Sequence, residues 1–421
     1  MNSNNRANGF SVRCVQDRHL PPSFMKTINT SSDKQLLYDL FQAYYDARKN
    51  KRNTVNALAF EIDYERKLFE LYEEIKNGKY EIGPSICFII FKPVQREVFA
   101  ADFRDRIVHH LIYNYISPIF ERLFIYDSYS CRKGKGTSCG INRLDHFIRS
   151  CSQNYNRDCH ILKIDIKGYF MSMDRSILYQ KIEKILYRFS DAADFDIDLV
   201  MRLIHKVIFH DPTQNCVIRG RKDNWKGLPK TKSLFFADEN KGLPIGNLTS
   251  QLFGNVYLND FDHFVKHRLG IKYYGRYVDD IIIAHQDKEY LKSIIPILRE
   301  YLRDELLLEL HRDKIYLQHF SKGVNFLGTV IKPYWIYIRN RIKGNFWRKV
   351  QYWNNLFLGK RYKLAKEDIR QFLSSINSYL GIMKHYNTYK LRKKILVRNL
   401  SACFWKYFCV SDNYDKLTAK I

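Results

Sequence analysis

Two groups of acidic residues stand at the ends of apolar segments in this chain. The tetrapeptide Tyr277-Val278-Asp279-Asp280 is flanked by the apolar stretch 281–284, and Asp165 closes the apolar stretch 159–166. Taken alone, the tetrapeptide is most simply a surface hairpin and Asp165 is most simply a helix cap or a charge at a sheet edge, since Asp is common in turns and caps. Adjacent carboxylates against a core repel each other, however, unless a cation lies between them.

Three carboxylates from two strands suit one reaction in particular. In-line transfer of a nucleotide uses two divalent ions about 3.5–4 Å apart, and Mg²⁺ prefers hard oxygen ligands while keeping waters and substrate phosphates in its shell. One ion activates a primer 3′-hydroxyl and the other stabilises the pyrophosphate leaving group. We therefore expect Asp165, Asp279 and Asp280 to converge around two Mg²⁺ ions, with Mn²⁺ as a possible substitute.

The segments that carry these residues must place them together. Residues 161–166 alternate as a strand, and 273–284 predict two strands around the acidic turn. Residues 250–265 predict one helix. From about residue 345 onward the pattern is helical and basic.

The N-terminal third predicts a mixture of helices and a strand. An N-cap at Asp33 begins one helix, a second covers 64–75 and stops near Gly78, and 86–91 is β-like. Arg104 opens a third helix. Within it, His109 and His110 are expected to pack or hydrogen-bond rather than bind a metal.

Composition indicates a polyanionic partner. The 421 residues include 70 Lys+Arg against 44 Asp+Glu, a formal net charge of +26, which favours nucleic acid or an anionic membrane surface. No segment approaches the ~18 apolar residues of a spanning helix, and the N-terminus lacks the apolar core of a secretory signal, so we expect no membrane. Nine cysteines without a CxxC pair argue against structural zinc and fit reduced thiols in a cytoplasm.

Seven blocks between Lys92 and Gly328 resemble, in order, those of reverse transcriptases. The resemblance implies an α+β right-hand polymerase with fingers, a palm of antiparallel sheet plus helices, and a helical thumb. It implies the following ranges: a flexible lead-in at 1–30, fingers at 31–155, a palm at 156–344 with an insertion around 190–245, and a thumb at 345–421. We expect no endonuclease or RNase H segment.

The resemblance also implies roles for individual residues. The metal ligands would be Asp165, Ile166, Asp279 and Asp280, and Lys314 would protonate pyrophosphate unless it is simply a solvated lysine. The incoming deoxynucleotide would contact Lys92, Arg96, Phe170, Ile245, Gly246 and Gln251. Template RNA and the RNA/DNA hybrid would contact Arg104, Arg106, Arg132, Lys133, Lys135 and Gly328.

Phe170 aligns with the steric gate that excludes a ribose 2′-hydroxyl. An ordinary core aromatic is the alternative interpretation. Asp174 is expected to cap the following helix rather than to join the metals.

The block 242–251, GLPIGNLTSQ, resembles the reverse transcriptases of diversity-generating retroelements within the group II intron-like bacterial enzymes. Trp225, Gly227-Leu228-Pro229 and 232–235 also fit that group. Such enzymes copy a template RNA with errors concentrated at adenines, and they work with a small basic pentameric accessory variability protein. Many relatives have Gln at the position of Ile245, and loss of that amide is expected to loosen checking of the nascent base pair.

Three alternatives stay open. The chain could be a retron or phage-defence reverse transcriptase, or an RNA-dependent RNA polymerase, which Phe170 disfavours. It could also be a non-enzymatic RNA-binding scaffold with a degenerate palm, which the three retained aspartates disfavour.

Overall fold

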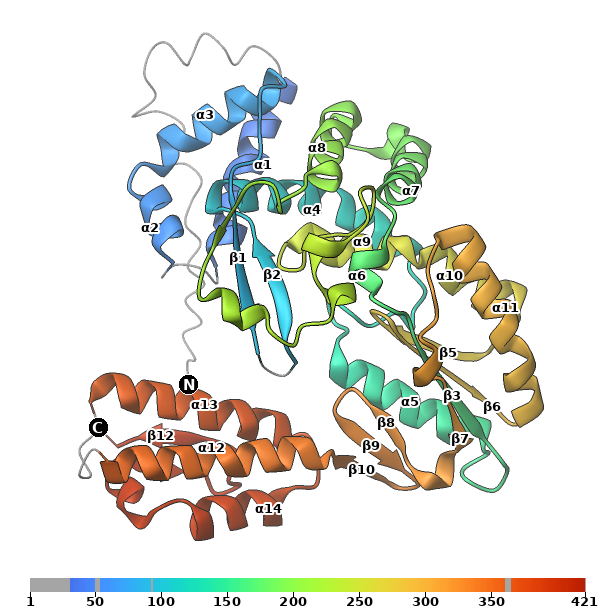
Figure 1. Ribbon diagram of the computed structural model, residues 1–421, viewed down its shortest axis with the longest axis vertical. Coiled ribbons are helices and arrows are strands. Elements are labelled where there is room, and N and C mark those ends of the chain that lie inside the picture. The colour runs from blue at the N-terminus through green and yellow to red at the C-terminus, as the bar shows by residue number, and fades with distance from the viewer. Residues whose placement is uncertain (1–30, 50–53, 92–93, 360–364, 421) are drawn as a thin grey trace, which may run out of the picture. The chain divides into compact units, whose positions relative to one another are not determined.

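The computed structural model describes residues 31–49, 54–91, 94–359 and 365–420. They form two compact units (Figure 1). The first unit contains the described residues up to Phe124 together with Gly168–Tyr257, and the second contains Ile125–Lys167 and the described residues from Leu258 onward. Each unit is described by itself below. Lys92 lies outside the described residues.

The first unit is mainly helical. Its longest helix, α4 (Phe103–Leu123), begins where the Asp102 side chain accepts a hydrogen bond from the Arg104 amide at 3.1 Å, and it packs against α1 and α9. The three predicted helices are confirmed as α1, α3 and α4, but the predicted N-cap at Asp33 is wrong, because α1 already begins at Ser31. The helices of this unit besides α4 are α1 (Ser31–Arg48), α2 (Val55–Glu61), α3 (Tyr64–Lys76), α6 (Tyr169–Ser172), α7 (Arg175–Arg188), α8 (Ile197–Phe209) and α9 (Leu248–Tyr257).

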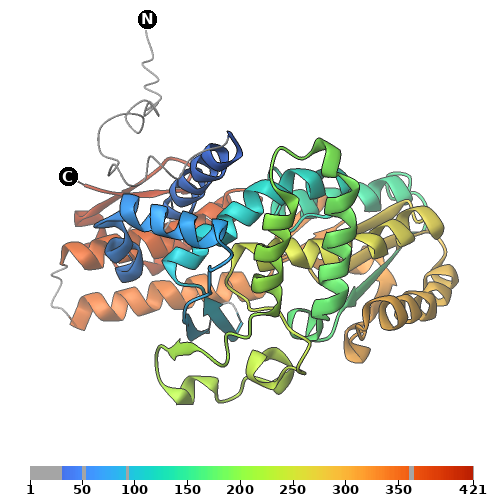
Figure 2. The same cartoon turned by 90° about the horizontal axis from the view of Figure 1, so that it is seen from above.

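A small sheet of order β2-β1-β4 completes the first unit. Strand β1 (Ser85–Ile90), which confirms the predicted strand, pairs antiparallel with β2 (Arg96–Ala100) and parallel with β4 (Cys216–Ile218). Four short 3₁₀ turns accompany these elements: η2 (Ser190–Ala192), η3 (Lys222–Trp225), η4 (Lys230–Lys232) and η5 (Leu234–Phe236). Figure 2 shows the segment after β4 extending away from α7 and α8.

The second unit is built on a four-stranded antiparallel sheet of order β5-β6-β3-β7. The predicted strands are confirmed as β3 (His160–Asp165), β5 (Tyr273–Tyr277) and β6 (Asp280–His285), and β7 (Tyr316–His319) lies at the edge. Helix α5 (Thr137–Cys151) covers one face, and α11 (Lys288–Leu306) lies over the other (Figure 1). The central strands are apolar on both faces because both faces are covered.

The predicted single helix over 250–265 is wrong. The chain instead forms α9, α10 (Asn259–His263) and the π-helical η6 (Phe264–Arg268), with an interruption at Leu258. The apolar pattern continues through Leu258, so the sequence gives no sign of the break. Asp262 in α10 is wholly buried, and its tertiary partners, described below, account for that burial.

The C-terminal part of the second unit has its own core. Helices α12 and α13 run side by side (Figure 1) around Phe346, Trp353 and Phe372. The prediction of an all-helical segment after 345 is wrong, because a two-stranded sheet ends the chain. The elements are β8 (Val324–Phe326), β9 (Thr329–Lys332), β10 (Trp335–Ile338), α12 (Asn340–Gly359), α13 (Lys366–Met383), α14 (Tyr389–Lys393), β11 (Phe408–Val410) and β12 (Leu417–Ala419). They are accompanied by the 3₁₀ turns η7 (Arg312–Lys314), η8 (Phe320–Lys322) and η10 (Ala402–Lys406) and by the π-helical η9 (Lys394–Asn399).

The predicted α+β class with antiparallel sheets is confirmed. The division into fingers, palm and thumb stays a prediction. The eight cysteines that the structure describes are free thiols. Among the described helices, none combines the length and apolar character that a membrane span requires.

Candidate active site

The acidic turn is the tip of a hairpin in the second unit. Strands β5 and β6 pair up to Tyr277 opposite Asp280, which leaves Val278 and Asp279 as the two turn residues. Val278 has a φ of 56°, a left-handed conformation that a β-branched residue adopts only at a cost in energy. The hairpin therefore needs support from its surroundings to hold Asp279 in place.

Antiparallel pairing places two of the predicted carboxylates opposite each other. Asp165 at the end of β3 is directly across from Asp280 at the start of β6. Side chains alternate along a strand, so Asp165 and Lys163 share a face, and Asp280 lies on that face too. This is the face that α5 covers, since Ile161 packs in its core cluster.

Two lysines balance the negative charge here. The Lys163 ammonium lies 3.0 Å from Asp280, and the Lys314 ammonium, at the end of η7, forms an ion pair and hydrogen bond with Asp165. Lys314 is half-exposed. These two ammonium groups bind the same carboxylate oxygens that a divalent cation would bind.

The pKa of the Asp279 carboxyl is far above that of an ordinary aspartate. Burial raises the pKa of its carboxyl to about 7, and the negative charge of Asp165 adds to the shift. At neutral pH the group is therefore divided between its protonated and ionised forms. A nearby cation would favour the ionised form by supplying opposite charge.

A buried ion pair holds the turn of the hairpin in place. Arg276 and Asp262 are both 0% exposed, and the Arg276 guanidinium binds Asp262 through Nε at 2.8 Å and Nη2 at 2.6 Å. Arg276 Nη1 also donates to the Val278 carbonyl at 3.0 Å. Tyr274 donates its hydroxyl to Asp262. The guanidinium thus links a buried helix carboxylate to the strained turn residue beside Asp279.

The donor set fits divalent ions by its chemistry, because hard carboxylate oxygens from two strands face one another beside compensating cations. In the part of the chain that the structure describes, however, no three His, Cys, Asp or Glu side chains are grouped so as to hold one ion in common. Ile166 is buried and forms an antiparallel bridge with Leu310. The predicted metal set of Asp165, Ile166, Asp279 and Asp280 stays a prediction.

The family follows from comparison with known proteins. Residues 95–331, more than half of the chain, match the family model described as reverse transcriptase (RNA-dependent DNA polymerase). This match spans both acidic groups and every element between them.

The chain belongs to the reverse transcriptase family. By family it is an RNA-directed DNA polymerase, as predicted.

Two kinds of relatives accompany this reverse transcriptase. Protein YkfC of Escherichia coli (strain K12) is 25% identical over 292 residues, which cover 61% of this chain and 69% of that protein. Among solved structures, a telomerase of Candida albicans in complex with a fragment of telomeric RNA aligns with a TM-score of 0.44 at 11% identity, covering 83% of this chain and 68% of that one. The apo telomerase of Candida tropicalis truncated from its C-terminal domain gives 0.43 at 13%, covering 61% of this chain and 55% of that structure's chain.

Of the residues predicted to contact the nucleotide, those that the structure describes lie in the first unit. Phe170, in α6, and Ile245 are half-buried and pack against one apolar cluster that includes Phe99. Gly246 has a φ of 135°, and a Cβ there would lie 2.8 Å from the Phe99 carbonyl oxygen, so glycine is required. Arg96 is exposed. Their roles as nucleotide contacts stay predictions, as do those of Gln251, which is exposed, and Lys92.

Several predicted nucleic-acid contacts are engaged within their own units. Arg104 forms an ion pair with Glu74, and Arg106 donates to the Ala101 carbonyl at 3.3 Å. Arg132 donates to two backbone carbonyls at 2.7 and 2.9 Å. Lys133 is exposed, and the Lys135 ammonium lies 3.2 Å from the centre of the Tyr126 ring. Binding of nucleic acid by these residues stays a prediction.

Two other predictions about single residues are confirmed. Asp174 caps α7, accepting from the Ile177 amide at 3.0 Å. His109 is buried and hydrogen-bonds through Nδ1 to the Thr249 hydroxyl at 2.7 Å.

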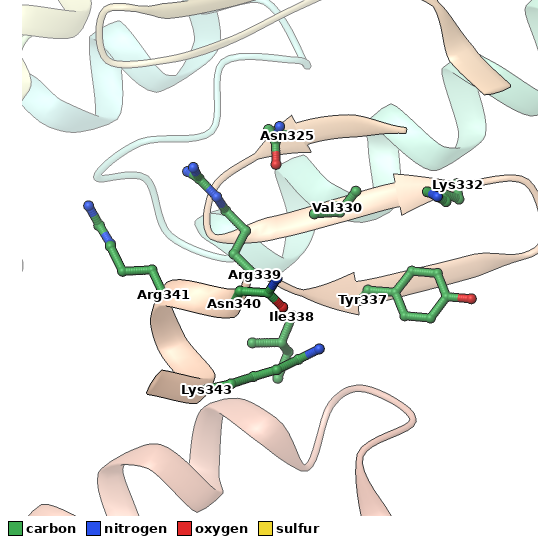
Figure 3. A pocket seen from close by; sticks show the side chains of 9 residues that line it. All are labelled: Asn325, Val330, Lys332, Tyr337, Ile338, Arg339, Asn340, Arg341 and Lys343. Atoms are coloured by element: carbon green, nitrogen blue, oxygen red, sulfur yellow. The ribbon is translucent and has the colours of Figure 1, made fainter. Parts of the chain in front are cut away.

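A basic pocket of about 530 Å³ lies where β8, β9 and β10 meet the start of α12 (Figure 3). It adjoins Gly328, one of the predicted nucleic-acid contacts, because the Arg339 amide donates to the Gly328 carbonyl at 3.1 Å. No carboxylate lines it among the described residues. Its polar lining consists of Asn325, Lys332, Tyr337, Arg339, Asn340, Arg341 and Lys343.

Sequence reasoning missed Lys163, Arg276 and Asp262. The first two carried a usable signal, since each is a single cation within an apolar strand next to a candidate carboxylate. Such a cation is expected to pair when its strand is buried. The identity of the partner depends on register and could not be deduced.

Proposed function

We propose that this reverse transcriptase copies a template RNA into cDNA as part of a diversity-generating retroelement, with errors concentrated at template adenines. The observation that supports polymerisation is the direct opposition of Asp165 and Asp280 across neighbouring strands, with Asp279 in the turn between β5 and β6. The family match supports the same reaction class.

The chain's own residues have distinct parts in the proposed reaction. Asp165, Asp279 and Asp280 would hold two Mg²⁺ ions, which would activate the primer hydroxyl and stabilise the leaving pyrophosphate. Lys163 and Lys314 limit repulsion among the carboxylates when positive charge is otherwise lacking. Arg276 holds the Val278 carbonyl and so positions Asp279. The proton on Asp279 must leave before that carboxylate can act as a ligand.

The more specific assignment depends on Ile245. Its apolar side chain packs in the same cluster as Phe170, the proposed steric gate. An aliphatic group there can restrain a base pair only by packing, whereas a Gln amide could also hydrogen-bond. We propose that this difference relaxes geometric checking, and that a small basic pentameric accessory protein assists copying.

The decisive experiment is primer extension on a defined RNA template with Mg²⁺ and deoxynucleotides, followed by sequencing of the cDNA. We expect full-length cDNA with misincorporation concentrated opposite adenine. Ile245→Gln should lower that error rate, and Leu243→Ile, a volume-conserving change of a buried neighbour, serves as the control. An error rate that is equal at all four template bases would favour a retron or phage-defence enzyme.

The catalytic assignment has its own test. Asp279→Asn with Asp280→Asn should abolish extension while RNA affinity is kept, and Asp304→Asn, at an exposed position, should change neither. Extension that persists in the double variant would remove these aspartates from the mechanism. Faster extension with ribonucleotides than with deoxynucleotides would instead indicate an RNA polymerase and contradict the gate role of Phe170.

A further inference from the structure

The segment from Arg219 to Phe236 in the first unit has no assigned role. It follows β4 and contains no helix or strand apart from the short turns η3, η4 and η5. Long connections without regular structure are uncommon in compact domains and are usually functional or disordered. This one is held to the sheet by specific contacts, which argues for a function that needs a fixed shape.

The anchor is a buried acid on β2. The side chain of Glu97, which is 1% exposed, accepts hydrogen bonds from Trp225 Nε1 at 2.7 Å, Ser233 Oγ at 2.9 Å and the Leu234 amide at 2.6 Å. A buried carboxylate is stable only when donors surround it. The neighbouring Gln95 amide donates to two backbone carbonyls of the segment, at 2.8 and 3.2 Å. The middle and the C-terminal end of the segment are thus fixed by β2 and the residue that precedes it.

The outer side of the segment is strongly basic. Between 219 and 232 it exposes six cations and one carboxylate, and that carboxylate, Asp223, pairs with Lys226 at 2.9 Å. The remaining five cations form no ion pair with any residue that the structure describes. They are Arg219, Arg221, Lys222, Lys230 and Lys232. Such a concentration of uncompensated charge attracts a polyanion.

Exposed aromatic rings lie beside these cations. Phe236 is 60% exposed and Phe235 is 39% exposed, and the Lys230 ammonium lies 5.2 Å from the centre of the Phe236 ring. Cations next to accessible rings are the combination by which proteins bind single strands, because phosphates bind the charges and unpaired bases stack on the rings. A duplex would offer its phosphates but not its stacked bases.

We propose that Arg219–Phe236, here called the basic loop, binds single-stranded RNA. The cations contact successive phosphates and Phe236 stacks on a base. This proposal rests on the proposed function in one respect, which is that a polymerase copying RNA must hold a template strand. An acidic protein would match the charge as well, but charge matching alone leaves the exposed Phe236 ring beside Lys230 without an explanation.

The test measures binding of a labelled, unstructured 20-nucleotide RNA to the full chain by fluorescence anisotropy at several salt concentrations. Arg219→Gln, Arg221→Gln and Lys222→Gln together should weaken binding roughly tenfold or more, and should reduce the slope of log K against log salt by about 2, at about 0.7 per lost phosphate contact. Phe236→Ala should weaken binding about fivefold or more without changing the slope. A duplex RNA should be affected less by Phe236→Ala.

The matched control neutralises three exposed cations elsewhere in the same unit, Lys184, Arg188 and Arg202, with the same change of net charge. Its RNA affinity should stay within about twofold of wild type. Equal losses in both triple variants would mean that only net charge matters and would overturn the proposal. Unchanged affinity in the basic-loop variants would also overturn it and leave the loop to an acidic protein partner.

Failure of this proposal is distinguishable from failure of the proposed function. Extension of an oligo-dT primer on poly-rA by the wild type tests polymerisation alone. If the wild type extends the primer but the loop variants bind RNA normally, only the basic-loop proposal fails. If the wild type extends nothing but the loop variants lose RNA binding, the basic loop stands and the polymerase assignment fails.

Discussion

The pairing of Arg276 with Asp262 allows folding and catalysis to be separated by experiment. Both side chains are 0% exposed, so Arg276→Met leaves a buried carboxylate without its partner. Breaking a buried pair in this way costs about 3–5 kcal/mol of unfolding free energy. The same change removes the donor to the Val278 carbonyl, and a hydrogen bond from a charged donor contributes about 1.5–3 kcal/mol.

A second variant separates the two effects. Arg276→Met with Asp262→Asn removes both charges and leaves an amide oxygen to accept from the Tyr274 hydroxyl. We expect urea denaturation to show that the double variant recovers at least about 1–2 kcal/mol relative to Arg276→Met. The Val278 carbonyl still lacks its donor, so kcat should stay roughly 10- to 100-fold below wild type, as the loss of about 1.5–3 kcal/mol predicts.

The kinetic assay is steady-state extension of oligo-dT on poly-rA with varied dTTP. Because Arg276 is 0% exposed and acts through the Val278 carbonyl, its side chain is not available to a bound nucleotide, so KM for dTTP should change less than kcat. Arg303→Met, which breaks an exposed ion pair with Asp304, is the control and should alter stability by less than about 0.5 kcal/mol. Recovery of both stability and kcat in the double variant would refute the positioning role.

Three further predictions concern pH and backbone conformation. Burial lowers the pKa of His109 to about 3, so the neutral imidazole contributes its full stability to the fold above pH 6.5 and less as the pH falls. Between pH 7.5 and 5 the wild type should lose about 2 kcal/mol more unfolding free energy than His109→Asn, measured by urea denaturation. Asp279 has a raised pKa of about 7, so the protonated carboxyl stabilises the fold at low pH and this stability is lost as the pH rises through 7. In EDTA the wild type should therefore lose at most about 3 kcal/mol of unfolding free energy between pH 5 and 9, before discounting for partial exposure, whereas Asp279→Asn should not. Gly246→Ala should cost about 1–3 kcal/mol of unfolding free energy, because Gly246 has a positive φ and an added Cβ would meet close neighbours. Gly344→Ala is the control: an added Cβ at this position in α12 meets no neighbouring atom within 4 Å, so the change should stabilise by about 0.5–1 kcal/mol. Equal effects of the two changes in thermal denaturation would contradict the conformational argument.

The local parts of the candidate site could be predicted from sequence because they depend on near neighbours in the chain. Apolar strand-formers around Asp279-Asp280 specify a hairpin, and the N-cap at Asp174 needs only the three residues after it. Spacing alone also places the strand that ends in Asp165. Burial of His109 follows from its place on the apolar side of a helix.

Tertiary structure decided what depends on register between distant segments. The opposition of Asp165 to Asp280, and the ion pair of Lys163 with Asp280, require β3 and β6 to pair in one alignment, and a shift by one residue would turn every side chain to the other face. The break at Leu258 has no local cause, yet it accompanies burial of the Asp262 carboxylate that Arg276 binds. Single-sequence patterns report periodicity within an element, whereas pairing energy is distributed over contacts between elements, and only the folded chain fixes those contacts.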